Sequence, residues 1–359
     1  MNRKTVALLT AAILCASAGG CGAIPKQSAK TASLKIGISV YDQYDTFVSE
    51  VISHLKSYAK EKEQEWNITI TLEVQDAHNV QLTQNDQMDD FIKRGFDIAC
   101  INLVDRTDAS SIIEKAKTAN VPVIFFNREL VKEDLQRWDQ LYYVGADAFE
   151  SGILQGEILA EACGKDFSSI DRNGDGIIQY VMLEGEAGHQ DSIVRTLYVI
   201  NTIKEKGYQV EKLGDEIANW NRAQAETKMN QFLKSFGDEI EVVLTNNDDM
   251  ALGAIDSLKK FRGSQKQAKA EGSPWPAVIG IDGTKVGLEA LQNRELLGTV
   301  LNDAKGQGEG MLELARSVVM GTELPEDIEL LDGKYIRLPY QKVTAENVDE
   351  VMWDIQIEN

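Results

Sequence analysis

Cysteine is scarce in this chain, with only four among 359 residues. The sequence holds no Cys-x-x-Cys pair and no cluster of cysteine with histidine, which excludes the common structural zinc sites. Cys15 and Cys21 belong to the N-terminal leader, and Cys100 and Cys163 lie in apolar stretches. We expect the latter two to be small thiols, buried or partly buried. A disulfide between them stays open as an alternative, although nothing in their spacing requires it.

Positive charge is also in short supply, since 37 lysines and arginines face 57 acidic residues and the net charge is −20. Nucleic acids and anionic membrane surfaces both attract clusters of Lys and Arg, so this balance excludes them as partners. Hydrophobic residues make up 43% of the chain and charged residues 26%, as in an ordinary globular protein. The length suggests two domains, each large enough to bury a core.

The first residues have the layout of a secretory signal, with a positive start followed by the apolar stretch 6–18, too short to span a membrane as a mature helix. Small residues then precede Cys21, and this end resembles a bacterial lipobox, except that Ala18 stands where that pattern prefers Leu. We therefore expect a signal peptide over 1–20 and export from the cytoplasm. A lipid on Cys21 is then the only membrane attachment, followed by a tether over 21–33.

From Leu34 onward, strand-like apolar runs alternate with segments of helical periodicity. The first block predicts strands at 34–40, 68–74, 97–104 and 121–126 with helices between them. After the polar stretch 128–140, a second block predicts strands at 142–145, 177–183, 241–245, 277–281 and 298–302. Such alternation is typical of βαβ units, so we expect an α/β protein with two doubly wound parallel-sheet domains. The polar insert 262–276 is expected to be a surface loop.

Polar side chains follow many of the predicted strands. They are neutral amides, carboxylates and one imidazole: Asp45, Asn102, His189, Asp191, Asn247, Asp282 and Asn302. Each alone is more often a turn residue or a helix cap. Ligands of doubly wound sheets, however, bind outside the carboxyl ends of the strands, and two facing sheets would place them in the cleft between. Amides and carboxylates are suited to a neutral, hydroxyl-rich ligand.

Three further residues fit such a site. Arg195 follows Asp191 by four residues, which makes either a weak surface ion pair or a clamp on adjacent hydroxyls. Phe47 and Trp220 would supply flat walls against the apolar face of a pyranose ring. Phe47 alone reads as core, whereas Trp220 lies between two asparagines and is harder to bury.

A separate motif lies at 171–179 and has the spacing of a calcium loop. Its oxygen ligands would come from positions one, three, five, seven and nine, namely Asp171, Asn173, Asp175, the Ile177 carbonyl and Gln179. Position twelve, where an EF-hand has a bidentate Glu, is Met182. The alternative is a turn rich in Asx and Gly that holds no metal. A calcium site would need one more acid from elsewhere.

These residues resemble those of the bacterial galactose/glucose-binding proteins, the receptors of the methyl-galactoside ABC transporter. The resemblance runs from about Leu34 to the C-terminus and is most specific in five stretches, 44–47, 101–105, 185–191, 246–248 and 299–303. It implies the periplasmic binding protein type I fold and a sugar-binding set made of Asp45, Phe47, Asn102, His189, Asp191, Arg195, Trp220, Asn247, Asp282 and Asn302. It also implies that Glu241 is the missing calcium ligand.

The resemblance further implies three chain crossings between the lobes, near 128–140, just after Asn302 and near 337–340. The first lobe would comprise 34–128 plus 303–336 and the second 129–302 plus 337–359. The implied ligand is D-galactose or D-glucose, bound by hinge closure of a monomer. The implied partners are an ABC permease and a chemoreceptor or sensor.

Other functions have less support in the sequence. A binding protein for another monosaccharide, acting mainly as a sensor for a membrane receptor, stays open. A sugar hydrolase would need paired carboxylates such as Asp45, Asp191 and Asp282, but no motif for an activated nucleophile accompanies them. A sugar-responsive transcription factor would need an N-terminal DNA-binding helix pair, and an export signal stands there instead.

Overall fold

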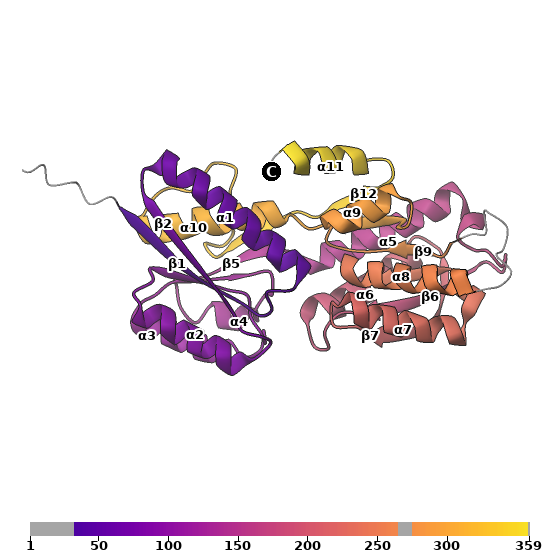
Figure 1. Cartoon of the computed structure of the whole chain (residues 1–359), viewed down its shortest axis with the longest axis horizontal. Coiled ribbons are helices and arrows are strands. Elements are labelled where there is room, and N and C mark those ends of the chain that lie inside the picture. The colour runs from indigo at the N-terminus through magenta and orange to yellow at the C-terminus, as the bar shows by residue number, and fades with distance from the viewer. Residues whose placement is uncertain (1–31, 265–274, 358–359) are drawn as a thin grey trace, which may run out of the picture.

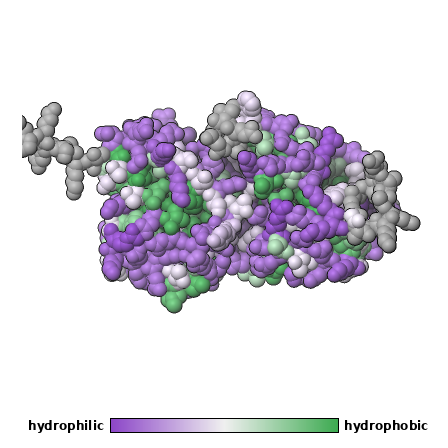
Figure 2. Space-filling model, viewed as in Figure 1, coloured by the Kyte–Doolittle hydropathy of each residue, from purple (hydrophilic) through white to green (hydrophobic). Residues whose placement is uncertain are grey.

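The computed structural model describes residues 32–264 and 275–357, which form two lobes side by side (Figure 1). The signal peptide, Cys21 and nearly all of the tether lie outside the described residues, as does most of the surface loop expected at 262–276. Among the helices described, none combines the length and the apolar character needed to cross a membrane. Figure 2 shows hydrophilic side chains over most of one face, with a hydrophobic area on each lobe.

The first lobe is built on a six-stranded parallel sheet. Its spatial order is β11 (Tyr335–Leu338), β5 (Leu141–Ala146), β4 (Val123–Phe126), β3 (Ile98–Ile101), β1 (Ser33–Val40) and β2 (Thr69–Asp76). Side chains alternate between its two faces, so Cys100 and Ile124 join one core cluster while Ile101 and Phe125 join the other. One cluster is covered by α1 (Thr46–Trp66) and α10 (Ala304–Met320), the other by α2 (Gln81–Lys93) and α3 (Ser110–Ala119). The short α4 (Lys132–Leu135) completes the lobe.

The second lobe repeats the plan with one antiparallel edge. Its sheet runs β12 (Gln341–Thr344), β10 (Gly298–Leu301), β9 (Ala277–Ile279), β8 (Val242–Thr245), β6 (Ile177–Glu184) and β7 (Gln209–Ile217), and β12 is antiparallel to β10. One face packs against α5 (Ala148–Lys165) and α6 (Gln190–Glu205). The other packs against α7 (Arg222–Ser235), α8 (Asp248–Ser264), α9 (Lys285–Gln292) and α11 (Val348–Ile357). Two 3₁₀ turns, Phe167–Ser169 and Gly237–Glu239, join elements of this lobe.

The chain crosses between the lobes three times, and the first crossing is not where the sequence suggested. The predicted strand near 142–145 is β5 of the first sheet, so the crossing falls at Asp147, between β5 and α5, and not in 128–140. Tyr143 and Val144 belong to the cores of the first lobe, which fixes β5 there. The boundary at 336 is also wrong, because β11 continues in the first sheet to Leu338. The other crossings lie between β10 and α10 and between β11 and β12.

The two cysteines among the described residues are free thiols. Both are buried, Cys100 in the first lobe and Cys163 in the second. Since the two lie in the cores of different lobes, the prediction of small buried thiols is confirmed and the disulfide alternative is not. Burial raises the pKa of the Cys163 thiol to about 11, so it stays protonated at neutral pH.

The lobes touch along both sides of the cleft between them. Thr46 at the start of α1 donates to Asp249 at the start of α8, with an Oγ1 to Oδ2 distance of 2.6 Å. On another part of the rim, Arg106 donates to Gln190 at 2.5 Å and Arg128 to Glu186 at 2.8 Å. Each bond joins a residue of the first lobe to one of the second, so the molecule adopts a closed arrangement.

Candidate functional site

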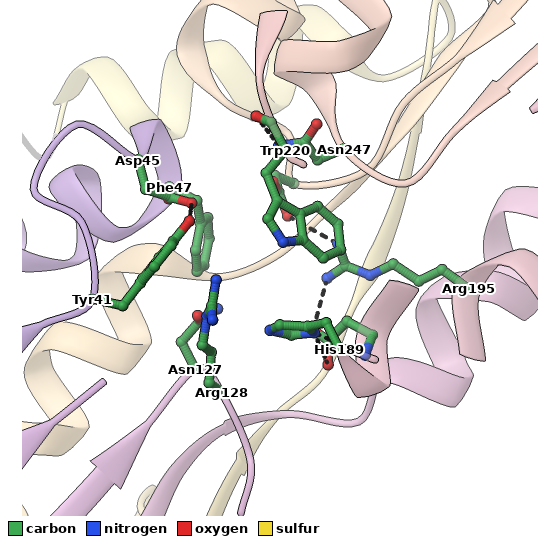
Figure 3. Close-up of a pocket in the computed structure, with 11 residues that line it drawn as sticks. Tyr41, Asp45, Phe47, Asn127, Arg128, His189, Arg195, Trp220 and Asn247 are labelled. Atoms are coloured by element: carbon green, nitrogen blue, oxygen red, sulfur yellow. Dashed lines mark hydrogen bonds and ion pairs between the residues drawn. The ribbon is translucent and has the colours of Figure 1, made fainter. Parts of the chain in front are cut away.

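A pocket lies in the cleft, at the carboxyl ends of strands from both sheets (Figure 3). The empty space between its side chains, including the part open to solvent, amounts to about 340 Å³. It is lined by Tyr41, Asp45, Phe47, Asn127, Arg128, His189, Asp191, Arg195, Trp220, Asn247 and Asp282. Eight of the ten residues predicted for the sugar site are therefore brought together, and Asn102 and Asn302 are not among the lining residues.

The first lobe contributes the end of β1 and the start of α1. Asp45 is the N-cap of α1, because its Oδ1 accepts the Val48 N–H at 2.8 Å. Its other oxygen accepts the Tyr41 hydroxyl at 2.5 Å. Phe47, the second residue of α1, is buried and lines the same wall. Asp45 is thus both a helix cap and a pocket residue, so the two interpretations of the sequence hold together.

The first-lobe amide that lines the pocket is Asn127, and Asn102 lies directly behind it. Asn102 is fully buried behind the pocket, where its Nδ2 donates to the Phe126 carbonyl and to Asn127 Oδ1, each at 3.1 Å. Asn127 follows β4 in a left-handed conformation, with φ 58°, and lines the pocket. Both asparagines end neighbouring strands of one sheet, so the rule applied to Asn102 would equally have found Asn127. The sequence could not choose between them.

Arg128 and Tyr41 were also missed. The Arg128 guanidinium lies 3.5 Å from the centroid of the Tyr41 ring. This cation–π contact positions the guanidinium at the wall of the pocket. The Arg128 side chain is almost completely buried, and it donates to the Val104 carbonyl and to Glu186. The only sequence signal was position, because Tyr41 and Arg128 follow β1 and β4 within one or two residues.

In the second lobe, Arg195 is buried and contacts several polar groups, so it does not form the exposed ion pair of a helix surface. Its guanidinium donates to the Asn246 carbonyl at 2.8 Å and to the Tyr340 hydroxyl at 3.1 Å. It lies 3.4 Å from Asp191 and 3.7 Å from Asp282, and all its neighbours are buried or nearly so. Arg195 therefore lies against two pocket carboxylates, so the surface ion pair is wrong, and the clamp on ligand hydroxyls stays a prediction.

His189 caps α6, because its Nδ1 accepts the Asp191 N–H at 3.1 Å. Burial lowers the pKa of His189 well below its usual range, and the cations Arg128 and Arg195 lower it further. The ring is therefore neutral, and with Nδ1 acting as acceptor its proton lies on Nε2. His189 thus presents a neutral N–H donor.

Trp220 forms the aromatic wall of the second lobe. Its ring meets the His189 ring edge-on, with centroids 5.1 Å apart. It also packs over Gly185, where an added Cβ would lie 2.2 Å from the indole, so only glycine fits. Asn219 and Trp220 both have positive φ, 50° and 61°, which is uncommon for such residues and typical of functional sites. The indole Nε1 is buried without a hydrogen-bond partner in the structure, so it can donate to a ligand.

Asn247 and Asp282 complete the second lobe's contribution. Asn247 Oδ1 accepts the Met250 N–H at 3.0 Å at the start of α8. Asp282 has a φ of 116°, which a non-glycine residue adopts only under constraint, and its backbone is held by β10 through the Val300 carbonyl at 2.8 Å. Burial raises the pKa of the Asp282 carboxyl well above its ordinary value, while Arg195 opposes that rise.

Asn302 lies beside this wall without lining the pocket. Its backbone N–H donates to the Asp282 carbonyl at 2.9 Å, and its side-chain oxygen accepts from Gln307 at 2.9 Å. Since Asn302 ends β10 at a crossing, its side chain ties the second sheet to α10 of the first lobe. The structure thus gives it a role at the hinge.

The pocket is nearly balanced in charge and rich in hydrogen-bonding groups. Three carboxyl groups face two guanidiniums, and burial favours the neutral form of one of the acids, Asp282. Amides, carboxylates, a neutral imidazole and an indole N–H offer both donors and acceptors, and two aromatic rings offer flat apolar surfaces. Such a lining suits a small neutral ligand with many hydroxyls and one apolar face.

The predicted calcium residues gather on one side of the second lobe, away from the pocket. Asp171 accepts backbone N–H groups of Gly174 and Gly176 at 2.8 and 2.9 Å, which closes the loop. Glu241 accepts from the Arg172 N–H at 2.6 Å and from the Gln179 N–H at 3.1 Å, so this distant acid does lie on the loop. In the described ranges no three carboxylate, imidazole or thiol groups are clustered as metal ligands. The all-oxygen set suits Ca²⁺ in chemistry, and the metal stays a prediction.

Comparison with known proteins agrees with this geometry. Residues 36–323 match the model of a family described as the periplasmic binding protein domain. The chain is 36% identical over 322 residues to the D-galactose/methyl-galactoside binding periplasmic protein of Haemophilus influenzae, covering 89% of this chain and 92% of the relative. It is also 30% identical over 331 residues to a xylitol-binding protein of Mycolicibacterium smegmatis, covering 92% and 82% of the two chains.

Solved structures show the same architecture. An ABC transporter solute binding protein of Bacillus halodurans, crystallised with myo-inositol, is 29% identical and superposes with a TM-score of 0.71 over 91% of this chain and 99% of its own. A periplasmic solute binding protein of Actinobacillus succinogenes with bound D-allose has a TM-score of 0.71 over 88% and 99% of the two chains, and at 19% identity it supports the fold alone.

Proposed function

The chain belongs to the periplasmic binding protein family, and we propose that it is the extracytoplasmic receptor of an ABC sugar transporter, closing its two lobes around one hexose, D-galactose or D-glucose. The observation that carries this proposal is the pocket itself. Its carboxylates, amides and aromatic rings come from both lobes and line one pocket between them. The similarity to a galactose and methyl-galactoside binding protein supports a hexose over other polyols.

The proposed mechanism is ligand-stabilised closure. Asp45 and Asn127 of the first lobe lie across the cleft from Asp191, Arg195 and Asp282 of the second. Sugar hydroxyls that bridge the two sets bind the closed form more tightly than the open form, so the ligand shifts the population toward closure. An ABC permease would then recognise the closed receptor. Binding requires no bond to be made or broken.

The direct test is calorimetry of the purified chain with D-galactose and D-glucose, alongside D-ribose, xylitol and myo-inositol. We expect at least one hexose to bind with a dissociation constant of about 1 µM or lower, on the order of −8 kcal/mol. The intrinsic Trp220 fluorescence should change with the same midpoint. Binding of a pentose or polyol with no hexose response at millimolar concentration would refute the hexose assignment.

We further propose a structural Ca²⁺ in the second lobe. Asp171, Asn173, Asp175, the Ile177 carbonyl and Gln179 would hold it together with Glu241, and the ion would brace the loop before β6 against β8. The convergence of Glu241 on this loop supports the proposal. Export and a lipid on Cys21 remain part of the proposed function, and mass spectrometry of the membrane-associated protein would test the modification.

A further inference from the structure

A second cavity lies beside the pocket and shares Arg128 and His189 with it. Its empty space amounts to about 850 Å³, including the part open to solvent, against about 340 Å³ for the pocket. The first lobe contributes Asn79, Gln81, Val104, Asp105, Arg106 and Thr107 to its walls, and the second lobe contributes Glu186, Ala187 and Gly188. The cavity therefore lies between the lobes and persists in the closed arrangement.

The partition between the two spaces includes the side chain of Arg128. One face of its guanidinium stacks on Tyr41, which lines only the pocket, at 3.5 Å. Its N–H groups point to the Val104 carbonyl and to Glu186, which line only the second cavity. A side chain rather than backbone therefore separates the two spaces at this point.

The walls of the second cavity are polar, balanced in charge and held in place. Asp105 and Glu186 oppose Arg106 and Arg128. Gln81 accepts the Asp105 N–H at 3.0 Å, and Arg106 donates to the Glu129 carbonyl at 2.8 Å, so the side chains are fixed before any ligand arrives. Nothing lies within 4 Å of the position of an added Cβ on Gly188, which leaves room at the second-lobe wall.

From these features we propose that the second cavity is a subsite for the substituent of a hexoside, with a second neutral sugar unit as the class of group that fits. The hexose part occupies the pocket, and the attached unit passes Arg128 and His189 into the adjoining space. This inference rests on the proposed hexose binding. Amide, carboxylate and guanidinium groups recognise hydroxyls in the second cavity as they do in the pocket, and the balanced charge disfavours an ionic substituent.

The experiment is calorimetry of the full chain with D-galactose, D-glucose and disaccharides that carry either sugar at one end. We expect at least one disaccharide to bind within about tenfold of its monosaccharide. Ala187→Trp fills the cavity from an exposed wall position and should weaken that disaccharide by about thirtyfold or more while changing monosaccharide affinity less than about threefold. Ala223→Trp, an exposed substitution on α7, is the matched control and should change neither.

A second variant, Thr107→Trp, fills the same cavity from the first lobe. It is used for the same measurement if Ala187→Trp lowers the melting temperature. Binding of the monosaccharide with no response from any disaccharide overturns the subsite and leaves the hexose receptor standing. Disaccharide binding that neither cavity-filling variant weakens overturns it as well. Failure of every monosaccharide and disaccharide overturns both proposals.

Discussion

The guanidinium of Arg128 lies 2.8 Å from the carboxylate of Glu186, and the pair joins one lobe to the other. Arg128 is buried and stacked on Tyr41, whereas the Glu186 side chain keeps 42% of its exposure. Because the two residues belong to different lobes, opening of the cleft would separate them. The pair therefore adds to the free energy of closure independently of the ligand.

Replacing Glu186 by Gln should reduce the population of the closed form and weaken hexose binding by up to about fivefold, because a half-exposed ion pair contributes about 1 kcal/mol or less. The salt dependence of binding should fall at the same time. Glu114→Gln, which removes a comparable pair with Arg137 inside the first lobe, is the control. Equal effects of the two variants in calorimetry would show that Glu186 does not act through closure.

Trp220→Ala should weaken hexose binding by about ten- to a hundredfold, because it removes an aromatic surface of the pocket and an indole N–H for which the described residues provide no acceptor. Trp353→Ala removes a tryptophan that is 63% exposed and should leave affinity unchanged. Titration calorimetry of both variants measures the difference. An unchanged dissociation constant for Trp220→Ala would contradict the stacking role.

We expect substitution of Asn127 to affect mainly ligand affinity and substitution of Asn102 to affect mainly stability. Asn127→Gly removes the pocket amide while keeping a residue that tolerates the positive φ, so affinity should fall about tenfold with little change in stability. Asn102→Ala leaves the buried Phe126 carbonyl without its donor and should lower the free energy of unfolding by about 1–3 kcal/mol. Denaturant unfolding and calorimetry on each variant test this, and the reverse pattern would restore Asn102 as the binding residue.

Removal of calcium with a chelator should lower the melting temperature by roughly 5–10 °C, as expected for a tightly held ion that binds only the folded lobe. Asp175→Asn should reduce the drop in melting temperature caused by the chelator, because the substitution removes the charge of one proposed calcium ligand. Asp215→Asn, a partly exposed acid on β7, should behave like the parent chain. A melting temperature that does not respond to the chelator rules out a structural calcium ion.

The stability of the closed molecule should fall as pH rises from about 4.5 through about 7 because of Glu50. Burial raises the pKa of its carboxyl to about 7, with Asp249 and Asp45 adding to the rise and the Lys285 N–H opposing it. A carboxyl with a raised pKa contributes most to stability at pH values below its pKa in the unfolded chain and loses that contribution as it ionises, here about 3 kcal/mol.

Glu50→Gln should flatten the pH dependence of the free energy of unfolding in that window. Glu61→Gln, at an exposed position on the same helix, should leave it unchanged. Urea unfolding at several pH values between 4.5 and 8 measures the slopes. Identical slopes in Glu50→Gln and the parent chain would exclude Glu50 as the titrating group.

Most strands and helices could be predicted because their hydrophobic patterns lie within single short segments of the sequence. The central strands β1, β3, β4, β6 and β8 are buried on both faces and appear as apolar runs, and the amphipathic α1 shows its periodicity directly. The edge strand β7 was missed because it is half exposed and reads as polar, QVEKLGDEI. The helix that follows, α7, has too few apolar residues to stand out.

The residue types of the site, and the rule that they follow strands, could be predicted before the fold was known, since chain order and side-chain chemistry are local properties. The folded arrangement was needed to show that β5 and β11 join the first sheet, that Asn127 lines the pocket in front of Asn102, and that Arg128 reaches Glu186. Sheet membership and contacts across the cleft depend on packing between segments far apart in the chain. No pattern within a single segment encodes them.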